Sequence, residues 1–176
     1  GGGGSNPGYL AEMGGVLYFT ANGPTGNCLY RSDGTAAGTY EVTTSTCTNP
    51  MYQTKVGGTL FFTGWTSTGW ELCASDGTSA GTRMVRKIYP GGSSSPSGFV
   101  AVGSFAYFRA NDGATGTELW RSDGTEAGTW RMADVNPGSG SSLPRAITPV
   151  GGAVYFVAND GVHGEEIWKS TGSNEG

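Results

Sequence analysis

Positive charge is scarce in this chain. Its 176 residues include 10 lysines and arginines against 14 aspartates and glutamates, which gives a net charge of −4 at pH 7. Nucleic acids and anionic membranes are bound through concentrated Lys and Arg, so we expect neither nucleic acid nor membrane insertion. No apolar run approaches transmembrane length and no signal peptide is present. We therefore expect a soluble or already processed chain.

Histidine and cysteine are also few. His163 is the only histidine, and no Cys or Asp stands at motif spacing from it, which argues against a zinc site or a catalytic triad. The three cysteines are an odd number and show no metal-site spacing. In an exported protein Cys28 and Cys47 could form a disulfide across the first repeat. Counting along the hairpin, however, places Cys28 nearer to Val42 than to Cys47.

Glycine, by contrast, is abundant, with 33 residues, and it marks a repeat. The stretch ELWRSDGTEAGT at Glu118–Thr129 recurs at Cys28–Thr39 and Glu71–Thr82, and a decayed copy lies at Glu166–Gly172. Four repeats cover the chain as one domain of 1–176, with bounds of about 7–49, 50–95, 96–143 and 144–172 and Gly/Ser-rich connectors at 1–6 and 171–176. A period of this length with several short β-rich runs is typical of propeller blades.

Four strands can be recognised in each repeat. In the third repeat they are expected at Ser97–Val102, Phe105–Ala110, Glu118–Ser122 and Thr129–Val135, which are rich in β-branched and aromatic residues. Asp-Gly pairs between them are suited to chain reversal. We predict an all-β, four-bladed β-propeller whose last blade lacks its outer strand. Half of an eight-bladed ring fits the same repeat count.

The two ends of the chain leave several alternatives open. The residues Gly1–Gly8 align with the connectors between repeats, although a GGGGS expression linker at Gly1–Ser5 would look identical. The fourth repeat could remain three-stranded, receive a strand from another chain, or belong to a longer tandem array. We favour the tandem array, because Gly- and Ser-rich ends suit flexible connectors.

The motif ELWxSDGTxAGT, followed by a PG(G/S)SSxP connector and GGxLYFxA, resembles the ELWxxDGT repeat family of bacterial surface and secreted proteins. The resemblance covers nearly the whole chain. The first copy departs from it as CLYRSDGT, the second as ELCASDGT and the last as EEIWKSTGS. The resemblance implies an exported, propeller-like module at the cell surface, without an established enzyme activity or catalytic residues.

Two loops with the pattern NDGxxGxE are the most site-like stretches. They could hold calcium, which prefers clustered oxygen ligands, through Asp112, Glu118, Asp160 and Glu166. An Asx turn between two strands explains the glycines better, and the first two repeats lack the Asp. We therefore expect no cofactor, with calcium as the alternative.

Aromatic residues fall into a regular and an irregular group. Rings that recur at fixed positions, such as Phe108 and Phe156, are expected to pack between blades. Trp65, Trp70 and Trp130 do not follow the repeat. Exposed tryptophans can stack on sugar rings, so these three are candidate carbohydrate contacts, with scattered surface aromatics as the simpler interpretation.

Repeated carboxylates and hydroxyl clusters complete the set of candidates. Glu71, Glu118 and Glu166 share one repeat position, which favours a structural hydrogen bond or ion pair over the asymmetric carboxylate pair of a glycosidase. The threonine-rich run could carry O-linked glycans on its hydroxyls. Its candidate acceptors are Thr43, Thr44, Ser45 and Thr46.

The sequence as a whole predicts a non-enzymatic module. We expect an extracellular structural or adhesive propeller bead whose partners are copies of itself or adjacent units of a longer chain or filament. A carbohydrate-binding propeller that recognises cell-surface glycans is the first alternative. A glycosidase-like propeller using Glu118 or Glu166 is the second.

Overall fold

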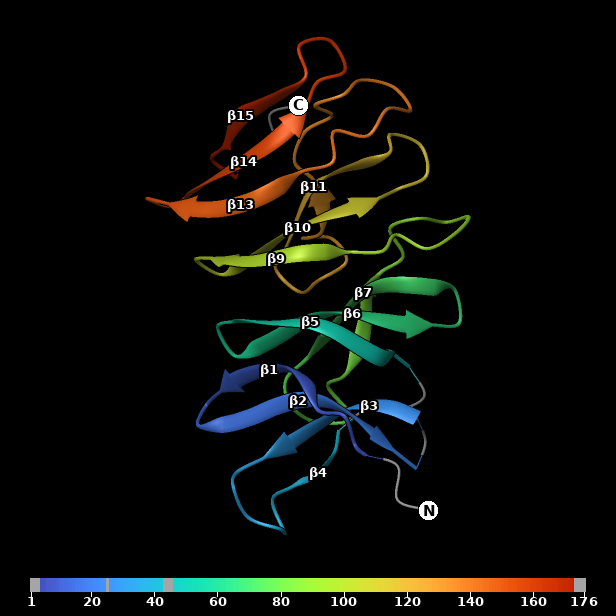
Figure 1. Ribbon diagram of the computed structural model, residues 1–176, viewed down its shortest axis with the longest axis vertical. Helices are drawn as coiled ribbons and strands as arrows, with labels where there is room; N and C mark the ends of the chain where they lie inside the picture. Colours follow the sequence, from blue (N-terminus) through green and yellow to red (C-terminus); the bar gives the residue numbers. More distant parts are fainter. Residues whose placement is uncertain (1–3, 25, 43–45, 173–176) are drawn as a thin grey trace.

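A computed structural model describes residues 4–24, 26–42 and 46–172. Over these residues the chain forms β-strands grouped in four antiparallel sheets, one for each repeat (Figure 1). No helix long and apolar enough to cross a membrane occurs in this part of the chain. The prediction of an all-β fold is confirmed.

The sheets are simple meanders in which each strand pairs with the next. The first sheet contains β1 (Gly8–Met13), β2 (Val16–Gly23), β3 (Gly26–Ser32) and β4 (Tyr40–Glu41). The second sheet contains β5 (Thr48–Val56), β6 (Thr59–Thr66), β7 (Gly69–Ser75) and β8 (Arg83–Arg86), and the third contains β9 (Ser97–Val102), β10 (Phe105–Asn111), β11 (Thr117–Ser122) and β12 (Trp130–Arg131). The fourth sheet contains β13 (Arg145–Val150), β14 (Ala153–Asn159) and β15 (Glu165–Ser170). The fourth sheet has three strands within the described residues, as predicted.

The DGT motif closes the hairpin between the third and fourth strands of a sheet. In the third sheet, Asp123 Oδ1 accepts hydrogen bonds from the backbone N and the hydroxyl of Thr125, at 2.8 and 2.7 Å. The hydroxyls of Ser122 and Thr129 pair across the turn at 2.7 Å. The same set of bonds recurs in the first two sheets. The motif is therefore a self-contained turn, and its Asp and Thr oxygens are used within it.

The four sheets are stacked in a row, with the N-terminal sheet at one end and the C-terminal sheet at the other (Figure 1). The first strands of consecutive sheets, β1, β5, β9 and β13, contact one another along the row. Every extensive contact between strands of different sheets, within the described residues, joins consecutive sheets. The four-bladed closure expected from counting repeats is therefore not confirmed, because the first and last sheets lie apart.

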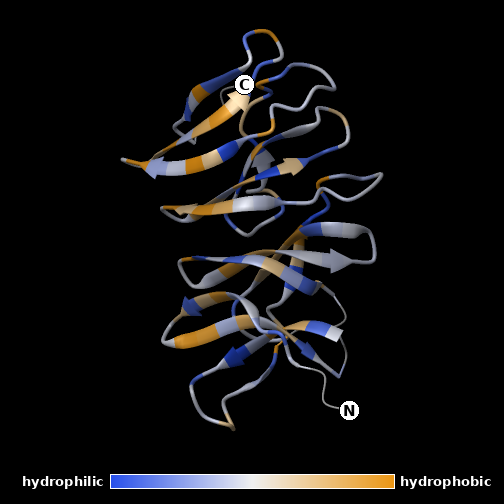
Figure 2. Ribbon diagram, viewed as in Figure 1, coloured by the Kyte–Doolittle hydropathy of each residue, from blue (hydrophilic) through white to orange (hydrophobic). Residues whose placement is uncertain are grey.

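Among the residues that the structure describes, the hydrophobic core consists of three clusters, each between two consecutive sheets. The largest side chains of the cluster between the second and third sheets are Phe61, Phe108 and Trp120. Figure 2 shows hydrophobic residues mainly on the strands of the sheets. Phe108 and Phe156 are both buried, at 0% and 3% exposure, so the predicted packing of the repeated rings is confirmed for these positions.

The disulfide differs from the one expected. Cys47 pairs with Cys73 on β7, with 6.2 Å between their Cα atoms, and the buried Cys28 lies outside this bond. The predicted Cys28–Cys47 pairing is therefore wrong. The backbone N of Val42 donates to the carbonyl of Leu29, which places Val42 opposite Leu29, the neighbour of Cys28 in the chain. The chain then crosses to the second sheet, where Cys47 packs over Gly64 and beside Cys73.

Candidate functional site

A cleft of about 450 Å³ opens between the second and third sheets. Its walls include Tyr52 from β5, Thr63 from β6, Trp70 from β7 and Arg109 from β10. The connector Ser95–Pro96 also lines it. Arg109 is held in place because its Nε donates to the Ser97 hydroxyl at 2.8 Å. The cleft thus combines aromatic faces with a cationic group and hydroxyls.

Two of the predicted sugar-stacking residues meet beside this cleft. Trp65 and Trp70 are directly opposite each other on β6 and β7. Their ring centroids are 5.2 Å apart with the planes at 73°, an edge-to-face arrangement. Trp65 is 45% exposed and Trp70 is half-buried. Large apolar surface is therefore presented to solvent next to hydrogen-bonding groups.

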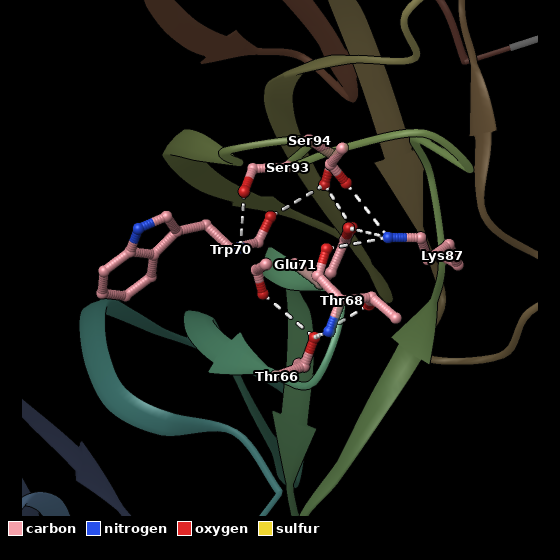
Figure 3. A network of polar contacts seen from close by, with 9 residues as sticks. Thr66, Thr68, Trp70, Glu71, Lys87, Ser93 and Ser94 are labelled. Atoms are coloured by element: carbon pink, nitrogen blue, oxygen red, sulfur yellow. Dashed lines mark hydrogen bonds and ion pairs between the residues drawn. The ribbon is translucent and has the colours of Figure 1, made fainter.

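The backbone of Trp70 is fixed by the serines of the following connector. Its N–H donates to the Ser93 hydroxyl at 3.0 Å, and its carbonyl accepts from the backbone N of Ser95 at 3.1 Å. Figure 3 shows the indole pointing away from the polar network formed by the neighbouring residues. The backbone of Trp70 thus links the second sheet to the connector that leads to the third sheet. Its half-buried ring remains available to contact a ligand.

Trp130 does not join the other two tryptophans. It lies on β12, where the Arg121 guanidinium is stacked 3.9 Å from its ring and 4.0 Å from the ring of Phe105. Its neighbours belong to the core cluster between the third and fourth sheets. Trp130 is therefore engaged in packing, and the predicted tryptophan set divides into a pair at the cleft and one structural residue.

Two of the repeated glutamates bind the connector that leads to the next sheet. We call each place where two consecutive sheets meet a joint. Glu71 is fully buried, and its Oε2 accepts from the Ser94 hydroxyl at 2.5 Å (Figure 3). Lys87 Nζ lies 3.3 Å from the other carboxylate oxygen and also donates to the carbonyls of Thr68 and Gly92. The predicted hydrogen-bond or ion-pair role is confirmed at this position.

Glu118 repeats this arrangement without a lysine. It is fully buried, and its carboxylate accepts from the backbone N and hydroxyl of Ser142, at 2.8 and 2.5 Å, and from the backbone N of Val135 at 3.3 Å. Burial raises the pKa of the Glu118 carboxyl, and the hydrogen bonds from Ser142 oppose this shift. Glu166, the third member of the set, is exposed.

The two calcium candidate loops use their oxygens locally. Asp112 accepts from the backbone N of Ala114 and from the backbone N and hydroxyl of Thr115. Glu118 is turned to the connector, away from this Asx turn. Within the described ranges, no group of three or more His, Cys, Asp or Glu residues lies together as a metal site. Calcium binding here stays a prediction.

The second candidate loop contains an ion pair. His163 Nδ1 lies 2.7 Å from Asp160 Oδ2, and this contact raises the pKa of the imidazole. Hydrogen bonds from His163 and Val162 hold the pKa of Asp160 well below its ordinary value. Of the four hydroxyls proposed as glycan acceptors, Thr46 is exposed, and Thr43, Thr44 and Ser45 lie outside the described residues.

The sequence did not single out Tyr52, Thr63 or Arg109 as site residues, and they come from separate strands of two repeats. Thr63 and Arg109 occupy the variable position of the GGxLYFxA motif, which does not by itself indicate a cleft. A signal was nevertheless present at Arg109, which occupies the repeat position held by Thr20 and Thr63 in the first two sheets. Arg109 therefore departs from the residue type of the earlier repeats at its position, as Trp65 and Trp70 depart from the repeat at theirs. Such departures indicate residues of the cleft region.

Comparison with known proteins supports the fold and does not assign a family. No protein-family model matches this chain, and no curated protein does. A similar solved structure is the computationally designed Ika8 protein, with 12% sequence identity and a TM-score of 0.52. The alignment covers 96% of this chain and 47% of that one, so the chain spans about half the length of the designed protein. The chain is thus an all-β protein of repeated antiparallel sheets.

Proposed function

We propose that the four sheets are consecutive blades of a β-propeller and that the chain is a structural or adhesive module of an extracellular assembly. The repeated joint carries this proposal. The glutamate of the ELW motif would be the first choice for chemistry, yet Glu71 and Glu118 are both buried against the connector to the next sheet. The repeated polar residues therefore serve assembly of one unit on the next.

Two further observations support an exported module. The Cys47–Cys73 disulfide suits an oxidising compartment, where such bonds persist. The resemblance to the ELWxxDGT repeats implies a surface or secreted protein. The separation of the first and last sheets supports a ring with more blades than these four sheets supply, such as an eight-bladed ring of which they form half.

Electron microscopy of the material released by the source organism tests this function. We expect beaded or continuous fibres whose repeat matches one such module, because units joined end to end extend in one direction. Discrete particles without lateral or end-to-end contact would refute the structural role. That result would favour the second candidate function, carbohydrate binding.

Carbohydrate binding is the second candidate, and the cleft beside Trp65 and Trp70 favours it. An indole face buries apolar sugar surface at low entropic cost, while Arg109 and hydroxyls around the cleft can bind sugar hydroxyls. We expect a glycan array to detect binding that is lost in Trp70→Ala. Tyr40→Ala is the matched control, because Tyr40 is 48% exposed but lies on the first sheet. Absence of binding to any glycan would refute this candidate.

A further inference from the structure

The two ends of the row differ from its interior in a specific way. We call the outward side of the first sheet the leading face, defined by Ser5, Leu17, Phe19 and Gly34. The outward side of the fourth sheet is the trailing face, defined by Tyr155, Glu166 and Ile167. Three contacts recur where consecutive sheets meet inside the row. For each of these contacts, the leading face has the residue equivalent to one partner, and the trailing face has the residue equivalent to the other partner.

The first contact is apolar. Leu29, Leu72 and Leu119 share a position on the third strand of their sheets, and each has 0% exposure. Leu119, for example, packs in a cluster with Val154 and Phe156 of the next sheet. Ile167 holds this position in the fourth sheet and is 78% exposed. The positions that would cover it correspond to Leu17, which is 38% exposed, and the half-buried Phe19.

The second contact places an aromatic ring on the glycine of the next DGT turn. A side chain at Gly77 would overlap the hydroxyl of Tyr18 in the preceding sheet, and one at Gly124 would meet Phe61 at 3.4 Å. Gly34 has the same left-handed backbone, with φ of +90°, yet nothing lies within 4 Å of the place of its Cβ. The ring at the corresponding position of the fourth sheet is Tyr155, which is half-exposed.

The third contact is the hydrogen bond between the ELW glutamate and the connector serine. Ser94 donates to Glu71 and Ser142 to Glu118, each at 2.5 Å. The carbonyls of these serines also accept from the second strand of the following sheet, at 3.0 and 2.9 Å. Ser5 has the same backbone bond, from the N of Asn22 at 2.7 Å, and its side chain is exposed. Glu166 is its exposed counterpart on the trailing face.

We propose that the leading face of a second copy of this chain docks on the trailing face, with Ser5 on Glu166, Gly34 on Tyr155 and Leu17 over Ile167. The inference rests on the proposed assembly role and names its partner. The internal joints supply the geometry, because the new joint continues a contact that already occurs between consecutive sheets. Such a contact is heterologous, so it forms a closed ring or an open row according to the rotation between copies.

The joint between copies is weaker than the internal ones. Leu119 is also covered by Met132 and Val135, which follow β11 in its own repeat. The fourth sheet has no counterpart of these residues in the described part of the chain. Part of Ile167 therefore stays uncovered in the joint. We expect reversible association that depends on protein concentration.

Analytical ultracentrifugation of the purified chain over roughly 1–100 µM tests the joint. We expect species heavier than the 18.0 kDa chain. Ile167→Asp places a charge in the apolar contact, and Glu166→Ala removes the acceptor of the Ser5 hydroxyl. Each is expected to raise the dissociation constant at least about tenfold. Both side chains are exposed in the single chain, so thermal unfolding of the dilute variants should remain unchanged.

Matched controls use exposed residues of the interior sheets. Glu126→Ala removes a carboxylate from a turn of the third sheet, and Met84→Asp introduces a charge at a 36% exposed position of the second sheet. Neither is expected to change association. A single-chain mass at every concentration would overturn the proposal, as would equal weakening in the controls. Single chains in solution together with native fibres would refute this joint alone, whereas discrete native particles would refute the assembly role.

Discussion

At the scale of single residues, the same side chain has opposite environments along the chain. Glu71 and Glu118 are fully buried and hydrogen-bonded, whereas Glu166 is exposed at the same repeat position. The difference arises from the connector that follows, since Ser94 and Ser142 supply hydroxyls to the buried pair. The role of this glutamate therefore depends on the presence of the next repeat.

Removing the Glu118 carboxylate should destabilise the fold. Glu118→Ala leaves the hydroxyl and backbone N of Ser142 and the backbone N of Val135 without their acceptor, and it opens space in a closed joint. We expect a loss of about 2–4 kcal/mol in the free energy of unfolding. Urea denaturation measures it. Glu126→Ala is the control, expected within about 0.5 kcal/mol of the wild type, and an equal effect of both changes would contradict the assignment.

The Asp160–His163 pair should make one part of the protein sensitive to pH. Because Asp160 binds the imidazole, the pKa of His163 lies above its ordinary value of 6.5. The stabilisation that this pair provides is present below about 6.5 and is lost as pH rises through the raised pKa. NMR titration of His163 should show this pKa, and Asp160→Asn should lower it. A titration that is identical in both proteins would exclude the interaction.

At the scale of elements, substitutions in the DGT turns can measure how tightly one sheet packs on the next. Gly77 and Gly34 have nearly equal φ values, +91° and +90°, but only Gly77 is in contact with a ring of the preceding sheet. Alanine at either position costs about 1–2 kcal/mol of backbone strain. Gly77→Ala should cost a further 1–3 kcal/mol or so, because its methyl group overlaps the Tyr18 hydroxyl.

Thermal or chemical unfolding of the two glycine variants, at a concentration where the chain is dissociated, gives the comparison. The difference between them isolates the packing of one sheet on the next from the strain common to both. Equal destabilisation would show that the ring of Tyr18 yields without cost. Gly34→Ala should in addition weaken association of copies, which a concentration series would detect.

Much of the element structure was predictable from the sequence, because strands and turns are local. Alternating β-branched and aromatic residues placed β9 correctly, and the Asp-Gly pair marked the hairpin that Thr125 and Thr129 close. The outer strand was expected at Thr129–Val135, but β12 is limited to Trp130–Arg131. The backbone N of Met132 still donates to the carbonyl of Leu119, and beyond it the chain turns away to the connector, where the backbone N of Val135 donates to Glu118.

The cleft and the disulfide were not predictable, because both depend on how one repeat lies on another. Cys47 was counted with the first repeat, although it packs against the second sheet beside Cys73. Arg109 and Trp70 line the same cleft only because β7 and β10 belong to facing sheets. The arrangement of the sheets in a row was not predictable for the same reason. The spacing of the repeats determines how many sheets form, but it does not determine the rotation between one sheet and the next.

At the scale of the whole molecule, the Cys47–Cys73 bond should contribute to overall stability. It joins residues separated by 26 positions and lies within the core between the first and second sheets. In the chain-entropy description, closing such a loop is worth about 3 kcal/mol. The Cys47→Ala/Cys73→Ala double variant should lose roughly this amount in urea denaturation. Cys28→Ala keeps the bond and should lose less, so a reversed order would contradict the pairing.

The row also has a mechanical consequence. Since the chain enters at one end sheet and leaves at the other, tension applied to its ends passes through every joint in turn. The covalent bond joins Cys47 to Cys73 within the second sheet and crosses no joint. All three joints therefore rely on non-covalent contacts, with carboxylate–serine bonds at the two that follow Glu71 and Glu118. A filament of such modules would stretch by opening joints one after another, while the segment from Cys47 to Cys73 stays closed by its disulfide.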